Sequence, residues 1–511
     1  MSEPRKPRPP RPPRGTPKGP GRGGAKRGGP GKGGPGRGGS GRGGPGKSGP
    51  NRSRDGRRDR NDRPRGPRLT NAQRARKAAA MAVADVLGRG FRLEGSLAKN
   101  PALDGLEPRD RAFARAIAAN TLRRLGQVDA VLAPLVKRPP PGRVRAFMQT
   151  ATAQMVFMDV APHAAVGDAV ALIKADSKSE PFAGLANAVL RRVADTGKAE
   201  AARVPPVANI PGWLRAEWER LYGKAAVRRM ALLLAQSPPL DLSVKDDPQA
   251  WAATLGGEVL AGATVRLPEI GNVAALTGFE DGAWWAQDVA ASLPARILRD
   301  AAGGLEGARV ADLCAAPGGK TLQLAGFGAN VTAVDLSEAR TARMRENLAR
   351  VGYADVAVVT ADITQFSADA PFDAVLLDAP CSATGTFRRH PDVLYNRRER
   401  DITPLTRLQD TLLAQAASLV RPGGVLVYAV CSLQEREGLP RVRKLLRKSP
   451  DFRLIPFSQP EGLSLAAERL DPAGTLRVLP SEAPDSRGMD GFFIAALRRQ
   501  GAKQSEGEPA P

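Results

Sequence analysis

The spacing of apolar side chains divides the chain into a helical part and a strand-rich part. From about residue 72 to residue 195, apolar residues recur every three or four positions, which is the period of one helix face. The stripes comprise Val144, Phe147, Met148, Ala151, Met155 and Met158; then Val166, Ala169, Val170 and Ile173; then Phe182, Leu185, Ala186, Val189, Leu190 and Val193. We therefore predict an all-α bundle whose Met residues are core. Predicted helix starts carry Pro108, Pro162 and Pro181, because the missing N–H of proline does no harm there.

A different pattern begins at about residue 301, where short apolar runs alternate with helix-compatible segments as far as residue 499. The predicted strands are 309–313, 331–335, 356–361, 372–377 and 425–430, with a late edge strand at 492–497. Such alternation is typical of a doubly wound α/β sheet, in which ligands bind at the carboxyl ends of the strands.

The segment between these two parts is less regular. A helix is predicted to open at Pro211 and to end near Gly223, and residues 240–244 alternate as a strand does. The adjacent Trp284 and Trp285 fit packing better than base stacking, and a helix is predicted after them. We expect a small α/β subdomain over residues 201–300, after a bundle over residues 71–200.

Composition adds two tails to this outline. The 511-residue chain is too long for one core, and its net charge is +25. Residues 1–70 hold 21 basic and 4 acidic residues, hence +17, in repeated Gly-Arg-Gly-Gly and Gly-Lys-Gly-Gly units. This composition predicts a disordered, Gly/Arg/Pro-rich basic tail that either binds RNA or only aids solubility. A second disordered tail is predicted over residues 500–511.

The charge balance favours RNA or DNA as the partner over an anionic membrane. Two basic pairs, Arg123 with Arg124 and Arg191 with Arg192, fit either a nucleic-acid contact or a solvated face. There is no apolar run of about 18 residues and no signal-peptide core, so we predict a cytoplasmic protein without a membrane partner. We expect it to be a monomer. The spacing of its three cysteines matches no metal-ligand pattern, so no metal is predicted.

The stretch from residue 309 to residue 321 reads as strand, tight turn and helix. The turn is made of Cys314, Ala315, Ala316, Pro317, Gly318, Gly319 and Lys320. Two residues without a Cβ let the backbone approach a ligand and place N–H groups at a helix start. The alternative is an ordinary connection whose glycines serve packing. The turn lacks the Gly-x-Gly-x-x-Gly and phosphate-loop spacings, so NAD and ATP are poor candidates.

Acidic residues end the next two predicted strands. Asp335 lies 17 positions after Gly318, close to the offset at which a carboxylate accepts hydrogen bonds from ribose hydroxyls. A nucleoside-containing cofactor is therefore implied. Asp362 ends the third strand, where it can accept from an adenine amino group or simply form a turn.

A cysteine follows each of the fourth and fifth predicted strands. Asp378 and Cys381 come after the fourth strand, and Cys431 comes after the fifth. Adjacent strand ends would bring two thiols and a carboxylate to one crevice. A thiolate is a strong nucleophile, so covalent chemistry is favoured over two inert buried cysteines.

These residues together resemble a known family. Residues 312–321, Asp335, Asp362, 378–382 and 431–432 are similar to the motifs of the Fmu/Sun-type, RsmB-like RNA cytosine-5 methyltransferases, which use S-adenosylmethionine. The helices that end in the segment Asn187 to Arg192 resemble a NusB-like domain. Further signature-like segments are 287–288, 388–392 and 490–493. The resemblance covers about residues 72–499.

The resemblance implies a fold, a cofactor and residue roles. The fold would be a NusB-like RNA-binding bundle, a small α/β subdomain, and a Rossmann-like class I methyltransferase domain over residues 301–499. Residues 314–320 would bind S-adenosylmethionine, with Asp335 at the ribose, Asp362 at the adenine and Asp378 at the edge of the site. Cys431 would attack carbon 6 of a flipped cytosine, Asp378 would bind the pyrimidine edge, and Cys381 would assist release.

Other functions remain open from the sequence. The substrate implied is small-subunit ribosomal RNA, with tRNA as an alternative. DNA cytosine-5 methylation would instead use the Pro380–Cys381 pair as nucleophile, and the presence of Cys431 argues against it. A protein of another class, a non-catalytic RNA-binding ribosome-assembly factor, would bind RNA without transferring a methyl group.

Overall fold

The computed structural model describes residues 69–501, except 269–270, 459, 461–468, 472, 483–484 and 486. Apart from two residues at each inner end, the tails predicted at 1–70 and 500–511 lie outside the described residues.

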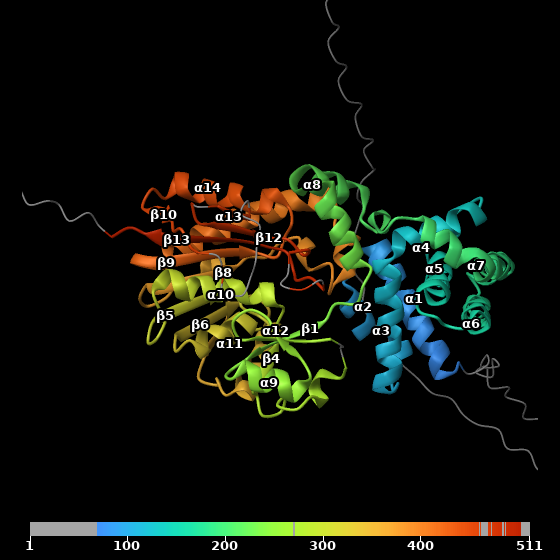
Figure 1. Cartoon of the computed structure of the whole chain (residues 1–511), viewed down its shortest axis with the longest axis horizontal. Helices are drawn as coiled ribbons and strands as arrows, with labels where there is room; N and C mark the ends of the chain where they lie inside the picture. The colour runs from blue at the N-terminus through green and yellow to red at the C-terminus, as the bar shows by residue number, and fades with distance from the viewer. Residues whose placement is uncertain are drawn as a thin grey trace, which may run out of the picture. The chain divides into compact units, whose positions relative to one another are not determined.

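Residues 71–203 form a bundle of α-helices, drawn in blue to green in Figure 1. They are α1 (Asn71–Arg89), α2 (Leu93–Ala98), α3 (Pro108–Arg123), α4 (Leu125–Leu132), α5 (Gly142–Phe157), α6 (Pro162–Lys174) and α7 (Ala183–Arg203). Thr70 begins α1 with a capping box that includes Gln73, and Gly90 ends the helix in the left-handed region. The bundle is therefore set by local signals at its ends and by apolar stripes between them.

Most of the predicted helix starts and stripe residues are confirmed, but Met158 lies just after α5 and is only half-buried. Pro108 and Pro162 open α3 and α6, and Pro181 lies in the short 3-10 turn before α7. Leu185 was predicted to be core but is 38% exposed. It lies off the buried stripe of α7, which runs through Ala183, Ala186, Val189, Leu190 and Val193.

The next segment forms α8 (Gly212–Leu234) and a four-stranded antiparallel sheet. Its strands are β1 (Leu240–Val244), β2 (Glu258–Val259), β3 (Thr264–Leu267) and β4 (Trp284–Ala286), in the order β2-β3-β1-β4, and α9 (Pro248–Leu255) lies between β1 and β2. The predicted helix end near Gly223 is a break with φ 81°, after which α8 resumes as far as Leu234. Trp284 and Trp285 are buried, as the packing interpretation predicts.

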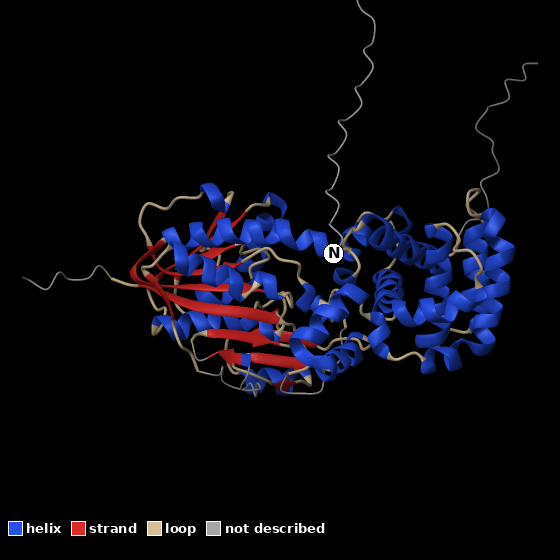
Figure 2. Ribbon diagram, turned by 90° about the horizontal axis from the view of Figure 1, so that it is seen from above, coloured by secondary structure: helices blue, strands red, loops and turns tan. Residues whose placement is uncertain are grey.

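The remaining chain builds a nine-stranded mixed sheet flanked by helices on both faces, which Figure 2 shows with strands in red. The strands are β5 (Arg309–Leu313), β6 (Asn330–Asp335), β7 (Ala357–Thr360), β8 (Phe372–Asp378), β9 (Val420–Val430), β10 (Phe452–Leu454), β11 (Leu470–Asp471), β12 (Thr475–Val478) and β13 (Phe492–Arg499). The helices are α10 (Val289–Ala302), α11 (Gly319–Gly326), α12 (Glu338–Val351), α13 (Ile402–Ser418) and α14 (Leu439–Lys448).

The strand order is β11-β12-β13-β9-β8-β5-β6-β7, and the ninth strand, β10, pairs with β13 off this path. Strands β9, β8, β5, β6 and β7 are parallel to one another. The prediction that residues 492–497 form an edge strand is wrong. β13 lies between β9 and β12 because the hairpin of β11 and β12 pairs along its outer side.

Alternate residues of the central strands face two separate cores. Val310, Leu376 and Val427 pack with α10, while Ala311, Leu377 and Tyr428 pack with α13 and α14. The chain leaves β5 toward β6 on one side and returns to β8 on the other. The carboxyl ends of β5 and β8 therefore flank the switch point at which such sheets bind ligands.

Candidate active site

The Gly-rich turn follows β5 directly. Cys314 takes a left-handed conformation with φ 60°, and Gly318 has φ 101° where it begins α11. A Cβ on Gly318 would lie 2.8 Å from Cγ of Met344, so a larger residue there would push against α12. Leu322 N donates to Gly318 O at 2.8 Å, which starts the helix immediately after the turn. The turn thus brings main-chain N–H groups to the switch point.

Asp335, at the end of β6, is joined to this turn. Its Oδ2 accepts from the N–H of Ala316 at 3.2 Å, and its Oδ1 accepts from the N–H of Ser337 at 3.1 Å. Arg340 pairs with Oδ2 at 3.2 Å. The carboxylate is buried, so the turn and the end of β6 form one rigid unit.

Asp362 lies at the end of β7 and is exposed. Its Oδ1 accepts from the N–H and the hydroxyl of Thr364 at 2.9 and 2.8 Å, and these bonds lower the pKa of Asp362. The side chain therefore forms the local turn that the sequence left as an alternative.

Lys320 connects the turn to β8. Its Nζ lies 2.7 Å from Oδ2 of Asp378 and 5.5 Å from the centre of the Phe492 ring. Burial alone would lower the pKa of Lys320, but the carboxylates of Asp378 and Asp312 outweigh it and raise that pKa. Lys320 is thus held as a cation between the turn and the end of β8.

The two cysteines after β8 and β9 meet. The Sγ atoms of Cys381 and Cys431 are 3.5 Å apart, and both residues are half-buried. The contact with Cys431 is the main cause that raises the pKa of Cys381, and burial adds to it. Cys314 belongs to the turn, where burial raises the pKa of its thiol. Of the three cysteines, two are therefore placed for joint chemistry.

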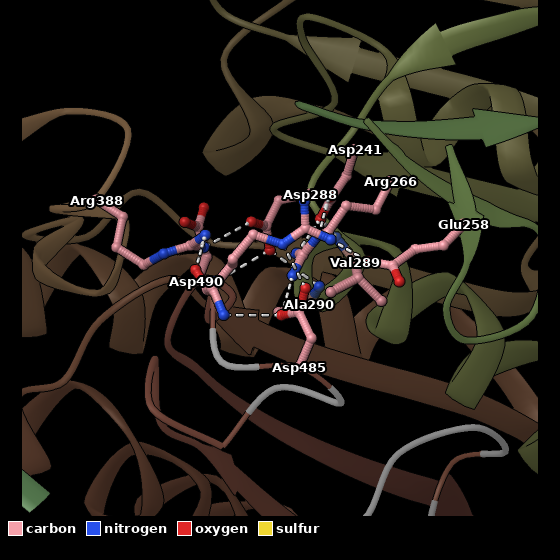
Figure 3. A network of polar contacts seen from close by, with 10 residues as sticks. Asp241, Glu258, Arg266, Asp288, Val289, Ala290, Arg388, Asp485 and Asp490 are labelled. Atoms are coloured by element: carbon pink, nitrogen blue, oxygen red, sulfur yellow. Dashed lines mark hydrogen bonds and ion pairs between the residues drawn. The ribbon is translucent and has the colours of Figure 1, made fainter. Parts of the chain in front are cut away.

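The three signature-like segments, to which the sequence analysis gave no roles, interact with one another. Arg388 Nη1 lies 3.3 Å from Asp288 Oδ2, Arg389 pairs with Asp490, and the N–H of Asp490 donates to Asp288 Oδ1 at 2.9 Å. Figure 3 shows how this cluster continues to Asp241, whose carboxylate binds Arg266 at 2.6 and 2.7 Å. The cluster joins the small sheet, the start of α10 and the segment before β13.

This cluster reaches the backbone of Cys431 through two glycines. Gly491 N donates to Gly385 O at 2.9 Å, and Gly385 N donates to Cys431 O at 3.0 Å. A Cβ on Gly385 would lie 2.1 Å from Gly491 O. The sequence analysis named residues 490–493 only as a signature-like segment and did not predict this contact.

The two basic pairs have different surroundings. Arg123 is buried and donates to the main-chain oxygen of Arg388, and burial lowers the pKa of Arg123 to about 10. The interpretation that Arg123 lies on a solvated face is therefore wrong. Arg191 and Arg192 are exposed on α7.

Two further features bear on the chemistry. No group of three or more His, Cys, Asp or Glu residues in the described ranges could hold a metal ion. Among the residues that the structure describes, no helix has the length and apolar character needed to cross a membrane.

The geometry fits a nucleoside with a charged tail. The Ala316 N–H of the turn is bound by Asp335, but α11 begins at Gly319 without a side-chain cap for its first N–H groups, and Asp335 ends the neighbouring strand. Leu336, next to Asp335, is 72% exposed and gives an apolar surface at the same edge. The sequence analysis missed Leu336, although an apolar residue directly after a strand-ending acid was a visible signal.

Comparisons with known proteins agree with this geometry. Residues 304–498 match the family described as 16S rRNA methyltransferase RsmB/F, and residues 73–195 match the NusB family. The ribosomal RNA small subunit methyltransferase B of Xanthomonas campestris pv. campestris is 35% identical, covering 83% of this chain and 96% of that protein. The protein of the same description from Pseudomonas putida is 34% identical, covering 83% and 98%.

Structural similarity extends over most of the described chain. The crystal structure of PH0851 aligns with a TM-score of 0.65 and 24% identity, covering 85% of this chain and all of that one, which supports the fold. The predicted fold class and family resemblance are thereby confirmed. The chain belongs to the RsmB/F family of S-adenosylmethionine-dependent RNA methyltransferases and carries a NusB-family domain before its catalytic domain.

Proposed function

We propose that this protein methylates carbon 5 of a cytosine in small-subunit ribosomal RNA through a covalent bond to Cys431. The observation that carries the proposal is the 3.5 Å approach of the Cys381 and Cys431 sulfurs beside the Gly-rich turn. The relatives are described as methyltransferases of small-subunit ribosomal RNA, which supports that substrate.

S-adenosylmethionine, when bound, supplies an electrophilic methyl group from its sulfonium. We assign its binding to residues 314–320, with Asp335 at the ribose hydroxyls and Leu336 against the base. Asp362 is the proposed partner of the adenine amino group. Its exposed position leaves the second carboxylate oxygen, Oδ2, available beside the Thr364 contacts.

The residues after β8 and β9 are assigned the chemistry on the cytosine. The Cys431 thiolate adds to carbon 6, which makes carbon 5 nucleophilic. Asp378, oriented by Lys320, accepts a hydrogen bond from the exocyclic amine of the base. Methyl transfer to carbon 5 would leave the donor as a neutral thioether. A base then removes the carbon 5 proton, its electron pair restores the double bond between carbons 5 and 6, and the carbon–sulfur bond breaks so that the thiolate of Cys431 returns. Cys381 is the group nearest to assist this release.

The test is to separate the two thiols. Purified wild type, Cys431→Ala and Cys381→Ala proteins are incubated with 30S-derived RNA and labelled methyl donor, and bisulfite sequencing locates the product. Cys431→Ala should lower turnover by roughly 10³-fold or more, because a nucleophile is removed. With 5-fluorocytidine RNA, the covalent adduct should form in wild type and Cys381→Ala and be absent in Cys431→Ala.

Each rival predicts a different outcome. An adduct lost only in Cys381→Ala would assign the nucleophile to Cys381, as in DNA cytosine-5 methylation. RNA binding without labelled product would indicate a non-catalytic assembly factor. If methylated cytosine were found in tRNA alone, tRNA and not ribosomal RNA would be the substrate. Cytoplasmic location and the monomeric state stay predictions from the sequence.

We also propose that the bundle over residues 71–200 binds the RNA, through a groove between α1 and α2 with a volume of about 1210 Å³. Its lining includes Arg74, Lys77, Arg89, Arg92, Lys99 and Arg143, with Asp85 and the 49% exposed Phe91. Clustered cations and an exposed ring suit phosphates and an unstacked base. The N–H of Leu93, beside this groove, donates to Asp392 Oδ2 at 3.2 Å, so the groove adjoins the loop that carries Arg389.

The groove is tested by charge removal. Lys77→Gln combined with Lys99→Gln should weaken RNA binding by about 10-fold and reduce the slope of log K against log salt by about 1.5. Arg191→Gln combined with Arg192→Gln removes equal charge from α7 and should leave both values nearly unchanged. If the two double variants lost RNA affinity equally, the proposal that RNA binds in this groove would be contradicted.

A further inference from the structure

Glu437 is a buried carboxylate that lies between the two cysteine loops. It ends a short 3-10 helix after β9 and has no exposed surface. Oε1 accepts from the N–H of Ser382 and from Nε2 of Gln409, both at 2.9 Å. Oε2 accepts from the hydroxyls of Ser382 and Ser432, both at 2.5 Å. All four contacts are donated to the carboxylate, which suits an acceptor-only side chain.

The two serines follow the two cysteines directly in the chain. Ser382 comes after Cys381, and Ser432 comes after Cys431. Their hydroxyls are 3.0 Å apart, so the carboxylate and the serines form one connected group. Thr384 extends the group, since its hydroxyl accepts from the N–H of Leu433 at 3.0 Å. One side chain thus fixes the loops that carry both thiols, although Ser382 and Glu437 are 55 positions apart.

We propose that Glu437 is a positioning residue that sets the spacing of the Cys381 and Cys431 thiols, which is the geometry that the covalent step and release require. The inference rests on the proposed cytosine-5 chemistry for its catalytic consequence, but the spacing itself is a property of the free protein. Glu437 holds the two loops through Ser382 and Ser432, and its charge also contributes to the raised pKa of the Cys381 thiol.

Chemistry explains why glutamate is needed here. A glutamine of the same size would place an NH₂ group where Oε2 now accepts from the Ser382 and Ser432 hydroxyls. The hydroxyls would then have to turn and accept, and their own protons would lose the carboxylate as acceptor. Leaving a buried polar group unsatisfied is costly, which favours a shifted loop. Because the loops carry the cysteines, such a shift separates the sulfurs.

The first test is steady-state kinetics of Glu437→Gln. We expect kcat to fall by about 10- to 100-fold, with KM for RNA and for the methyl donor changed less than threefold. Ser382→Ala and Ser432→Ala should each give smaller losses of the same kind. The matched control is Tyr428→Phe, which removes the 2.7 Å bond from the Tyr428 hydroxyl to Glu437 O but leaves the four carboxylate contacts. It should retain kcat within about twofold.

Two kinetic results would overturn the inference. A Glu437→Gln enzyme with wild-type kcat would show that the carboxylate is dispensable. Parallel losses in kcat and in the binding of both RNA and methyl donor would show general damage to the fold and no specific effect on the thiols.

The second test needs no RNA and no cofactor. Phenylarsine oxide condenses with two neighbouring thiols, forming two arsenic–sulfur bonds and releasing one water. Mass spectrometry should find one bridged adduct in wild type and in Tyr428→Phe, none in Cys431→Ala, and a rate at least 10-fold lower in Glu437→Gln. An unchanged rate in Glu437→Gln would refute the inference even if methylation is confirmed. A lowered rate in a protein that never methylates cytosine would refute only the proposed function.

Discussion

The carboxyl edge of the large sheet has two halves that are built differently. At the ends of β5 and β6, the contacts are mainly between a carboxylate and main-chain N–H groups, as where Asp335 binds Ala316 and Ser337. At the ends of β8 and β9, the contacts are mainly between side chains, as where Glu437 binds Ser382 and Ser432. The first half is assembled within about 20 residues of chain, and the second spans 55.

Under the proposed function, this difference places donor binding in one half of the edge and the chemistry on the base in the other. Main-chain donors are supplied by the fold and survive most substitutions, so the β5–β6 half suits a ligand that is bound in the same way each time. A single substitution can remove a side-chain contact, so the β8–β9 half should be more sensitive to substitution than the β5–β6 half. Lys320 is the exception, because it joins the halves through Asp378.

After loss of the proposed nucleophile itself, the largest effect is expected at Lys320. Lys320→Met leaves Asp378 without its cation at the edge of the crevice, and breaking one partner of such a pair costs roughly 3 kcal/mol. We expect kcat/KM to fall by about 100-fold, with donor and RNA both affected because the residue belongs to both halves. Lys320→Arg should recover part of the loss. A change confined to donor affinity would show that the halves work independently.

A smaller effect, limited to one half, is expected at Asp335. Asp335→Ala removes the proposed acceptor of the ribose hydroxyls, and a hydrogen bond to a charged group contributes about 1.5–3 kcal/mol. Calorimetry should show donor affinity lowered by about 10- to 50-fold. The rate of the phenylarsine oxide reaction at Cys381 and Cys431 should not change, and a change there would contradict the division into halves.

An effect on stability, with no direct effect on either half of the site, is expected at Asp312 beneath the turn. Burial raises the pKa of Asp312 to about 7, although Oδ2 accepts from the Thr321 hydroxyl at 2.6 Å. An unfolded Asp has a pKa of about 3.9. Between these values the native protein holds a proton that the unfolded chain lacks, so the free energy of unfolding falls as pH rises through this window.

Asp312→Asn removes that titration. We expect the variant to match wild type in stability near pH 4 and to be more stable than wild type at pH 8. Each kcal/mol of unfolding free energy that the variant keeps at pH 8 should raise its Tm by about 2–4 °C. Thermal melts from pH 4 to pH 8 measure the difference. A constant difference between the two proteins across this range would mean that Asp312 does not titrate there.

The same contrast explains what the sequence could predict. The turn at residues 314–320, Asp335 and the two cysteines follow strands whose periodicity is local, so their shared edge could be inferred from the parallel order alone. Glu437, Gly385 and the pairing of Arg389 with Asp490 depend on contacts between distant segments, for which a single sequence has no period. The place of β13 was mistaken because the short strands β11 and β12 give almost no hydrophobic pattern.

The contact of Gly491 with Gly385 has a consequence for synthesis of the protein. The backbone beside Cys431 is held by a segment that leaves the ribosome after nearly all of the preceding chain, including both thiols and the Gly-rich turn. A nascent chain can therefore contain the complete Gly-rich turn before the backbone beside Cys431 is held, because the bond from Gly491 to Gly385 forms only after residue 491 has been translated.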